Sequence, residues 1–277
     1  MGGVRFVTAS DGVKLAAHVT GSGPPVYAIH GGPANDHTGF GDHLAPISSY
    51  AELCLLDQRG CGESDDAAAE TYTLDRLAKD IEDVRLAFGH HKIHLLGHSF
   101  GGAVVLAYAL QFPQNVAALI IVDSLVRGWR DILAWPGGWS IWARYGLESL
   151  KKRPNWEALQ VKHEVANRDK VEETRRLLRG VRFDPARERP LIKSASRRMD
   201  AKPLIEAGVP LLGIYGKQDR RFLGGAQYLR SIGARVELIE GSGHQPYVEQ
   251  PEQFHSILRE FNRNAVSPRS PPPFALP

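Results

Sequence analysis

Residues 93–102, IHLLGHSFGG, constrain the fold of this chain more than any other stretch. The apolar run before Gly97 predicts a buried strand, and AVVLAYALQF after Gly102 predicts a buried helix that ends before Pro113. Between them lies the sequence G-x-S-x-G, with Ser99 at its centre. Glycines suit so tight a turn because they let backbone segments approach closely, while the serine takes a strained conformation. We therefore expect the Ser99 hydroxyl to project at the N-terminal end of a helix, where it is a candidate nucleophile.

The rest of the chain alternates between strand-like and helical patterns. Residues 4–8 and 13–19 alternate apolar and polar side chains around Asp11-Gly12, which predicts an antiparallel hairpin. Thr73 is suited to cap a helix whose apolar side chains recur every three or four residues up to Phe88. Further strands are expected at 25–30, 51–57, 116–122, 209–215 and 235–239, and a last helix from 251 to about 262. This alternation predicts an α/β fold with a mostly parallel sheet, whose ligands bind beyond the carboxyl ends of the strands.

The pattern changes between residues 125 and 203, where strand-like runs give way to helical, charge-rich segments. This stretch holds nineteen Lys or Arg, ten Asp or Glu, and all five tryptophans: Trp129, Trp135, Trp139, Trp142 and Trp156. We expect residues 1–124 and 204–265 to form one catalytic domain and residues 125–203 to form a helical lid inserted into it. Residues 266–277 are too rich in proline to pack regularly and predict a mobile tail.

Composition narrows the classes of function. A net charge of +3 gives no argument for nucleic acid as a partner. The chain has two cysteines: Cys54 in an apolar run and Cys61 in a turn a few residues later. We therefore expect no disulfide framework, which fits a reducing compartment. The N-terminal residues lack the apolar core of a signal peptide, and no apolar run has transmembrane length. We therefore expect a cytoplasmic protein with no membrane span.

Two further motifs carry a family resemblance. His30-Gly31-Gly32-Pro33 follows one predicted strand, and residues 57–64, DQRGCGES, follow the next. Together with a serine on a turn, an acid after a late strand and a histidine after the last strand, they resemble the α/β-hydrolase fold superfamily. The chain is most similar to its proline iminopeptidase-like branch. It differs from that branch at Ala34, and at His98 and Phe100 beside the serine.

The resemblance implies a fold with helices on both faces of the sheet and a set of catalytic residues. Ser99 would be the nucleophile, His244 the base and Asp219 the acid that orients the histidine. The oxyanion hole would consist of the backbone N–H groups of Gly32 and Phe100. Neither a cofactor nor a metal ion is expected.

The identity of the acid has an alternative. Asp219 ends a clean strand and follows a Gly-x-x-Asp turn, which favours it. Asp123 ends the strand after the predicted helix that follows Ser99, and some members of the superfamily place the acid there. At the other predicted loops, we expect scaffold roles for His30, Asp57 and Arg59, and an unreactive Cys61. For His37 and His43 we expect solvent exposure, with a place in the lining of a pocket as the alternative.

These features favour a serine hydrolase that cleaves a carboxylic ester, a lactone or a related acyl bond through an acyl-enzyme. The positive charge of the lid suits a neutral or anionic substrate better than one with a free ammonium group. Trp135, Trp139 and Trp142 are candidate substrate contacts, which predicts a small acyl compound that is apolar or aromatic in part. One alternative is an exopeptidase like proline iminopeptidase, in which carboxylates of the lid would bind the substrate amine. The sequence does not select among the available glutamates, which are Glu148, Glu157, Glu164, Glu172 and Glu173. Another alternative is a ligand-binding receptor with little turnover.

Overall fold

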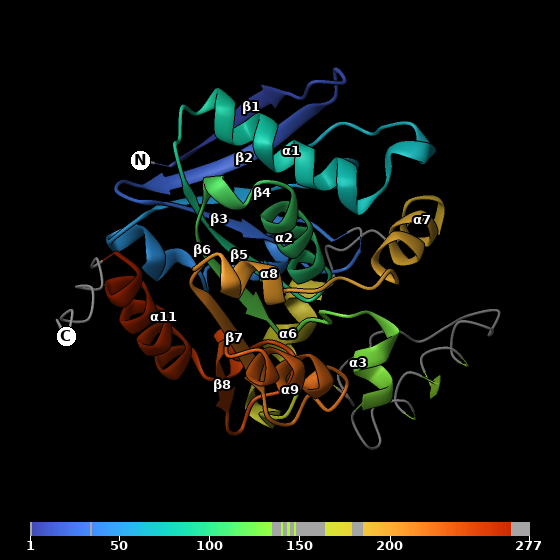
Figure 1. Cartoon of the computed structure of the whole chain (residues 1–277), viewed down its shortest axis with the longest axis vertical. Helices are drawn as coiled ribbons and strands as arrows, with labels where there is room; N and C mark the ends of the chain where they lie inside the picture. The colour runs from blue at the N-terminus through green and yellow to red at the C-terminus, as the bar shows by residue number, and fades with distance from the viewer. Residues whose placement is uncertain are drawn as a thin grey trace, which may run out of the picture.

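The computed structural model describes residues 2–33, 35–134, 140, 143–144, 147, 164–178 and 185–266. Eight strands form one twisted sheet in the order β1-β2-β4-β3-β5-β6-β7-β8 (Figure 1). The β1–β2 and β2–β4 pairs are antiparallel, and every other pair is parallel. The mostly parallel α/β sheet is therefore confirmed. The strands are β1 (Gly3–Thr8), β2 (Lys14–Gly21), β3 (Pro25–Ile29), β4 (Glu52–Leu56), β5 (Ile93–His98), β6 (Val116–Val122), β7 (Leu211–Gly216) and β8 (Arg235–Ile239).

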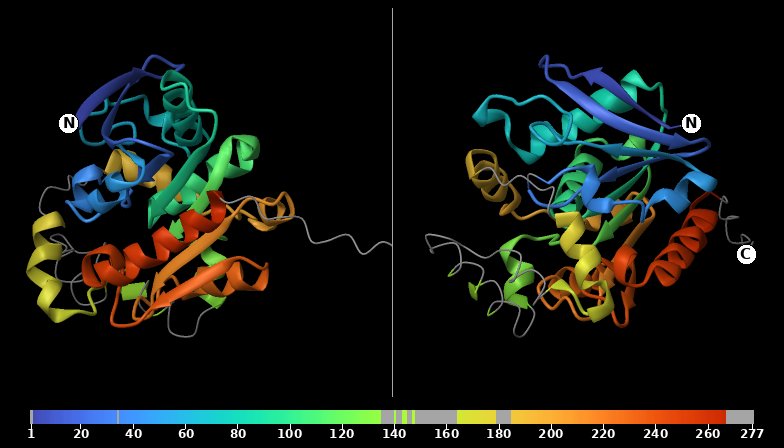
Figure 2. Two further views of the ribbon diagram at one scale, coloured as in Figure 1. Left: turned by 90° about the vertical axis from the view of Figure 1, so that its left-hand side faces the viewer. Right: turned by 180° about the vertical axis from the view of Figure 1, so that it is seen from behind.

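Helices cover both faces of this sheet (Figure 2). Side chains alternate along each strand, so Tyr27 and Ile29 of β3 join one buried cluster while Val26 and Ala28 join the other. On the first face lie α1 (Leu74–Ala87), α2 (Phe100–Gln111) and α9 (Leu223–Ser231). On the second lie η1 (His37–Phe40), η2 (Ala45–Ser49), α10 (Pro246–Glu249) and α11 (Pro251–Val266). Two short 3-10 helices, η3 (Ala69–Thr71) and η4 (Pro113–Asn115), complete the connections.

The two predicted helices that flank the sheet begin where the sequence indicates. Thr73 caps α1, because its hydroxyl accepts a hydrogen bond from the backbone N–H of Arg76 at 3.2 Å. Pro251 opens α11, where its missing N–H costs nothing. That helix continues to Val266, beyond its predicted end near residue 262.

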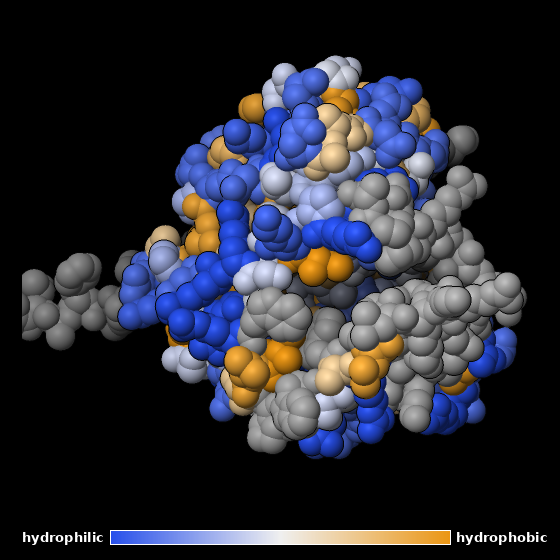
Figure 3. Space-filling model, turned by 90° about the vertical axis from the view of Figure 1, so that its right-hand side faces the viewer, coloured by the Kyte–Doolittle hydropathy of each residue, from blue (hydrophilic) through white to orange (hydrophobic). Residues whose placement is uncertain are grey.

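Between β6 and β7, the described residues form helices and no strand: α3 (Trp129–Ala134), η5 (Arg168–Lys170), α6 (Val171–Leu178), α7 (Pro185–Ala195) and α8 (Lys202–Glu206). The helical character of this insertion agrees with the sequence, and its role as a lid remains a prediction. α6 contacts η1 (Figure 2), and Glu173 pairs there with His43 at 3.0 Å. Among the described residues on the face shown in Figure 3, hydrophilic ones predominate and hydrophobic ones form small separate groups. Among the described residues, no helix combines the length and the hydropathy needed to cross a bilayer.

Candidate active site

The turn between β5 and α2 holds Ser99 in the left-handed region, with φ 53° and ψ −119°. Glycines surround it because other backbone segments come very close. A Cβ on Gly97 would lie 2.4 Å from the carbonyl oxygen of Gly101, and one on Gly101 would lie 2.1 Å from that of Ile29. The strained serine and its two glycines therefore form the tight turn that the sequence predicts.

A histidine and an acid lie in the loops after β8 and β7. His244 Nδ1 lies 2.6 Å from Asp219 Oδ2, and both side chains are buried. Burial alone would raise the pKa of Asp219, but the Arg221 guanidinium and His244 lower it well below its usual value. Asp219 is thus a carboxylate at neutral pH, and His244 donates its Nδ1 proton to it, which leaves Nε2 as the basic nitrogen.

Arg221 holds this acid in place, and sequence reasoning missed it. Its Nε donates to Asp219 Oδ1 and its Nη2 to Oδ2, both at 2.8 Å. Its Nη1 donates to Glu164 of the insertion, which is buried as well. Glu164, one of the candidates for binding a substrate amine, is therefore engaged with Arg221. The only signal in the sequence is an arginine two residues after the acid.

Asp123, the alternative acid, has a different role. It follows β6 with a positive φ of 39°, and both of its carboxylate oxygens accept from the backbone N–H of Gly216, at 3.0 and 3.1 Å. Burial and the nearby charge of Asp219 raise its pKa well above the usual value. The geometry therefore favours Asp219 as the partner of His244, with Asp123 fixing the end of β7 beside it.

The loop after β3 lies against Ser99. A Cβ on Gly31 would approach the Cβ of Ser99 to 3.0 Å, so this loop and the turn after β5 are in contact. His30 is buried under the loop and accepts from the backbone N–H of Gln58 at 3.1 Å. Gly32 has a φ of 120°, which only glycine adopts readily.

The remaining predicted site residues divide into two groups. Phe100 is the first residue of α2, so its N–H has no partner in a preceding helical turn and is available to an anion. The three tryptophans proposed as substrate contacts, Trp135, Trp139 and Trp142, lie outside the described residues.

His98, beside Ser99, contacts the loop that carries His244. Its Nε2 donates to the backbone oxygen of His244 at 2.8 Å, and Tyr247 Oη lies 3.3 Å from its Nδ1. Burial lowers the pKa of His98 well below its usual value, so the ring is neutral. A neutral ring that donates through Nε2 accepts through Nδ1, which makes Tyr247 the donor. Sequence reasoning noted His98 only as a departure from the family.

A buried glutamate, also missed, fastens the insertion to the same loop. Glu249 accepts from the backbone N–H groups of Gly243 at 2.9 Å, Ala166 at 2.7 Å and Asn167 at 2.8 Å. The backbone N–H of His244 in turn donates to the oxygen of Glu164 at 2.6 Å. A short piece of the insertion is therefore part of the support of His244.

The expected scaffold roles agree with the contacts. Arg59 is buried and pairs with Asp80 at 2.6 Å and Asp11 at 2.9 Å. Burial raises the pKa of the Cys61 thiol to about 12, so this cysteine is protonated at neutral pH.

The expected exposure of His37 and His43 is wrong. Both are partly buried, because His37 contacts Asp57 and His43 contacts Glu173. Each partner lies on another segment of the chain, which is why the sequence did not reveal the burial.

Comparisons with known proteins agree with this geometry. A family model described as the alpha/beta hydrolase fold matches residues 24–251. A proline iminopeptidase of Saccharolobus solfataricus is 29% identical over 272 residues, which cover 88% of this chain and 86% of that relative. One from Heyndrickxia coagulans is 24% identical over 274 residues, covering 87% and 91%. The resemblance to the proline iminopeptidase-like branch is therefore confirmed.

Solved structures show the same fold. A proline iminopeptidase-related protein from Thermus thermophilus aligns with a TM-score of 0.79 at 22% identity, covering 96% of this chain and 99% of that one. A thermophilic esterase from Thermogutta terrifontis aligns with a TM-score of 0.74 at 23% identity, covering 96% and 100%. The likeness extends over nearly the whole of each chain.

Proposed function

Because this chain belongs to the α/β-hydrolase fold family and is an enzyme of the serine hydrolase type, we propose that it cleaves carboxylic esters, lactones or related acyl compounds. The observation that carries the proposal is the arrangement of three loops. Ser99, Asp219 and His244 follow β5, β7 and β8, which are parallel strands of one sheet. Their carboxyl ends therefore meet at one edge, which is where ligands bind in such folds.

In the proposed reaction, His244 removes the hydroxyl proton of Ser99 as its oxygen attacks the substrate carbonyl carbon. The backbone N–H groups of Gly32 and Phe100 stabilise the oxyanion. The intermediate collapses to an acyl-enzyme, and the leaving alcohol takes the proton from His244. A water then attacks the acyl carbon and gives one proton to His244. His244 passes this proton to the Ser99 oxygen as the acyl bond breaks, which releases the acid and restores the free serine and the neutral histidine.

Asp219 keeps His244 in the productive tautomer throughout this cycle and stabilises its protonated form. Arg221 is a positioning residue, since it holds both oxygens of Asp219.

The second candidate is a proline iminopeptidase-like exopeptidase, which the sequence relatives favour. An enzyme of that kind binds the free ammonium group of its substrate with carboxylates. Here Glu164 is bound to Arg221, and Glu173 pairs with His43 and Lys170. These two carboxylates are already paired, and residues 125–203 carry a positive net charge. Both observations support the proposal that the substrate is an ester or a related acyl compound.

One experiment separates the candidates. A fluorophosphonate probe is expected to label the wild-type protein and not Ser99→Ala, and hydrolysis of aryl esters is expected to exceed hydrolysis of a prolyl naphthylamide. A strong preference for the naphthylamide would establish the exopeptidase instead. Absence of labelling in folded protein would favour a receptor with little turnover. We further propose that the substrate is a small acyl compound, apolar or aromatic in part, and that the protein is cytoplasmic.

A further inference from the structure

A cavity of about 610 Å³ lies at the edge of the sheet where β3 and β5 begin. Ser99 follows the other end of β5, so the cavity and the proposed catalytic site lie at opposite edges of the sheet. The lining residues come from the starts of three strands and from α11: Pro24, Val26, Tyr50, Ala51, His94, Arg259, Asn262 and Arg263. We propose that this cavity binds a small carboxylate with an apolar body, such as an arylalkanoic acid.

The size and the walls of the cavity suit a small organic molecule. Sites for such ligands have volumes of about 300–1,000 Å³ and mainly apolar walls with a few polar groups. The sheet contributes Val26 and His94, which lie opposite each other on β3 and β5. Val26 and Ala51 are buried and, with Pro24, form the apolar part of the lining. These walls favour a ligand with a hydrocarbon body, which inorganic anions lack.

Several polar atoms of the lining lack partners. Among the described residues, Tyr50 Oη, His94 Nδ1 and Asn262 Oδ1 are buried and have no hydrogen-bond partner. Buried polar atoms normally have one, because an unmade hydrogen bond is costly there. Burial raises the pKa of Tyr50, and Arg259 and Asn262 oppose this effect, so both lie near the phenol. Tyr50 and Asn262 are nevertheless not in hydrogen-bonding geometry with each other.

A ligand carboxylate would supply the missing acceptors. The Tyr50 hydroxyl donates to such an oxygen, and rotation of the Asn262 amide exchanges its oxygen for an NH₂ donor. Burial lowers the pKa of His94, which is 6% exposed, so its ring is neutral. The neutral ring donates through Nδ1 in one of its two tautomers.

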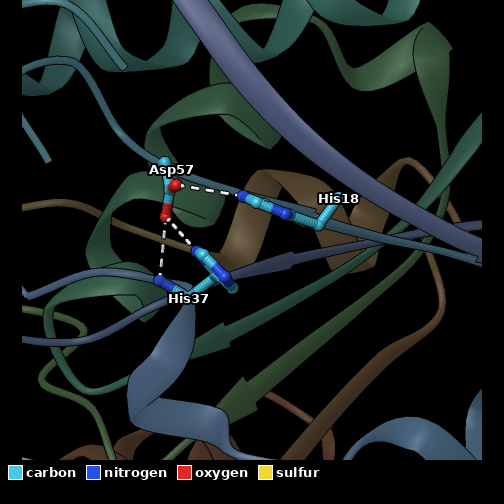
Figure 4. A group of neighbouring side chains, drawn as sticks. All are labelled: His18, His37 and Asp57. Atoms are coloured by element: carbon cyan, nitrogen blue, oxygen red, sulfur yellow. Dashed lines mark hydrogen bonds and ion pairs between the residues drawn. The ribbon is translucent and has the colours of Figure 1, made fainter. Parts of the chain in front are cut away.

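The histidine–aspartate group near the β1–β2 edge of the sheet provides a contrast. His18 and His37 each direct a ring nitrogen at a different oxygen of Asp57, at 3.2 and 2.8 Å (Figure 4). Their rings are stacked, with centroids 3.6 Å apart. These side chains satisfy one another, whereas the polar atoms of the cavity await a partner from outside.

The charge of the lining favours an anion. Arg259 and Arg263 contribute two positive charges, and no Asp or Glu lines the cavity. Among the described residues, neither guanidinium forms an ion pair. The acids nearest to the lining in sequence, Glu52 and Glu260, contact His90 and Arg235 instead.

The two arginines face the same way as Asn262. Residues 259, 262 and 263 have the spacing i, i+3, i+4, so they share one face of α11. A cation in the last turn of a helix also stabilises its carboxyl end, which accounts for Arg263. Arg259 lies about two turns before the end of α11, where this effect has faded. A guanidinium group matches the planar geometry of a carboxylate, which makes this anion the preferred ligand.

The test is binding of 4-phenylbutyrate to the full-length protein by isothermal titration calorimetry at low salt. One saturable site with a Kd of about 0.1–1 mM is expected for a ligand of this size. Two matched compounds separate charge from apolar contact: neutral 4-phenylbutanamide, and butyrate without the ring. Both should bind at least about tenfold more weakly. Inorganic phosphate should compete weakly or not at all.

Variants assign the site. Arg259→Gln and Arg263→Gln should each weaken binding at least about fivefold, and Asn262→Phe should abolish it by filling the cavity. Arg198→Gln, which removes an exposed arginine elsewhere, should bind like the wild type. Circular dichroism establishes that each variant is folded. Backbone amide chemical shifts should change most near residues 50–52, 93–95 and 259–263.

Three results would overturn the proposal. The first is the absence of saturable binding up to about 10 mM. The second is undiminished binding in folded Arg259→Gln and Arg263→Gln, or equal affinity for 4-phenylbutanamide. The third is a pattern of chemical-shift changes centred on Ser99 and His244, which would assign the ligand to the catalytic site. None of these measurements uses hydrolase activity, so the test is independent of the proposed function.

Discussion

Replacing Asp219 by asparagine, with Asp123→Asn as its matched control, distinguishes the two candidate acids. Both are buried aspartates at the carboxyl ends of neighbouring strands, and asparagine has nearly the same shape. Asp219 Oδ2 accepts from His244 and from Arg221 Nη2, while Oδ1 accepts from Arg221 Nε. Both oxygens of Asp219 accept from Arg221, so in Asp219→Asn the NH₂ group faces an N–H donor of Arg221 in either orientation of the amide. The substitution therefore removes the acceptor of His244 or a partner of Arg221.

The magnitude follows from these contacts. Loss of the partner that fixes the histidine tautomer lowers kcat about 10⁴-fold in serine hydrolases with a triad, or about 5.5 kcal/mol. Breaking a buried ion pair by neutralising one side costs about 3–5 kcal/mol of stability. Glu164 still pairs with Arg221, which places the expected loss for Asp219→Asn at the lower end, about 3 kcal/mol.

Asp123→Asn should behave differently. An asparagine oxygen still accepts from the N–H of Gly216, and asparagine tolerates the positive φ of 39° at this position. Activity within about tenfold of the wild type is expected, because no transition-state contact is lost.

The assay is steady-state hydrolysis of an activated aryl ester by both variants, together with chemical denaturation to measure the free energy of unfolding. Comparison with Ser99→Ala sets the background rate. If Asp219→Asn keeps more than a tenth of the activity while Asp123→Asn loses it, the assignment of the acid is wrong.

Three further predictions rest on single contacts. Gly101→Ala places a Cβ 2.1 Å from the oxygen of Ile29 and should lower the free energy of unfolding by about 3 kcal/mol, as measured by chemical denaturation. Gly39→Ala, with open space around its Cβ, should change it by less than about 0.5 kcal/mol, and equal effects would contradict the packing argument. Because the folded-state pKa of Asp123 is raised, its contribution to stability falls as pH rises above its ordinary pKa value of about 4. The Tm of Asp123→Asn should therefore increase relative to that of the wild type as pH rises from that value, and a constant difference in Tm would contradict the raised pKa. With a thiol pKa of about 12, Cys61 should react with iodoacetamide at neutral pH about a hundredfold more slowly in native than in denatured protein. Mass spectrometry of the alkylated peptide measures both rates, and rapid labelling of the native protein would contradict the burial of Cys61.

Local patterns were enough to predict the sheet and its main helices. β6 and β8 occupy the predicted residues, and Thr73 caps α1 as expected, because strand alternation and capping depend on a few neighbours in sequence. The turn around Ser99 was predictable for the same reason, since the glycines that permit it lie two residues away on either side.

The support of the site was not predictable, because it joins residues distant in sequence. Arg221 meets Glu164, which lies 57 residues before it, and His98 meets Tyr247 at a separation of 149 residues. No periodicity or motif links such pairs. The family resemblance marked His98 only as a departure from the expected pattern and assigned it no role.

The histidines show the same limit. His18 and His37 have no distinguishing pattern in the sequence, since one lies in a strand and the other in a loop. Only the pairing of β2 with β4 and the path of the loop after β3 bring them to Asp57. An amino acid's chemistry can be read from its type, but its partner is set by the topology.

The contact of residues 164–167 with the His244 loop has a consequence for exchanging specificity between enzymes. Glu249 binds Ala166 and Asn167, and a Cβ on Gly243 would lie 1.9 Å from the oxygen of Glu164. Residues 164–167 therefore help to hold the loop of His244 in place, although they lie within the insertion between β6 and β7. A chimaera that receives a foreign segment should keep them and graft on either side. Joining the segments within 164–167 would disturb the loop of His244, the base in our proposal, and we expect such a chimaera to lose activity whatever the shape of its pocket.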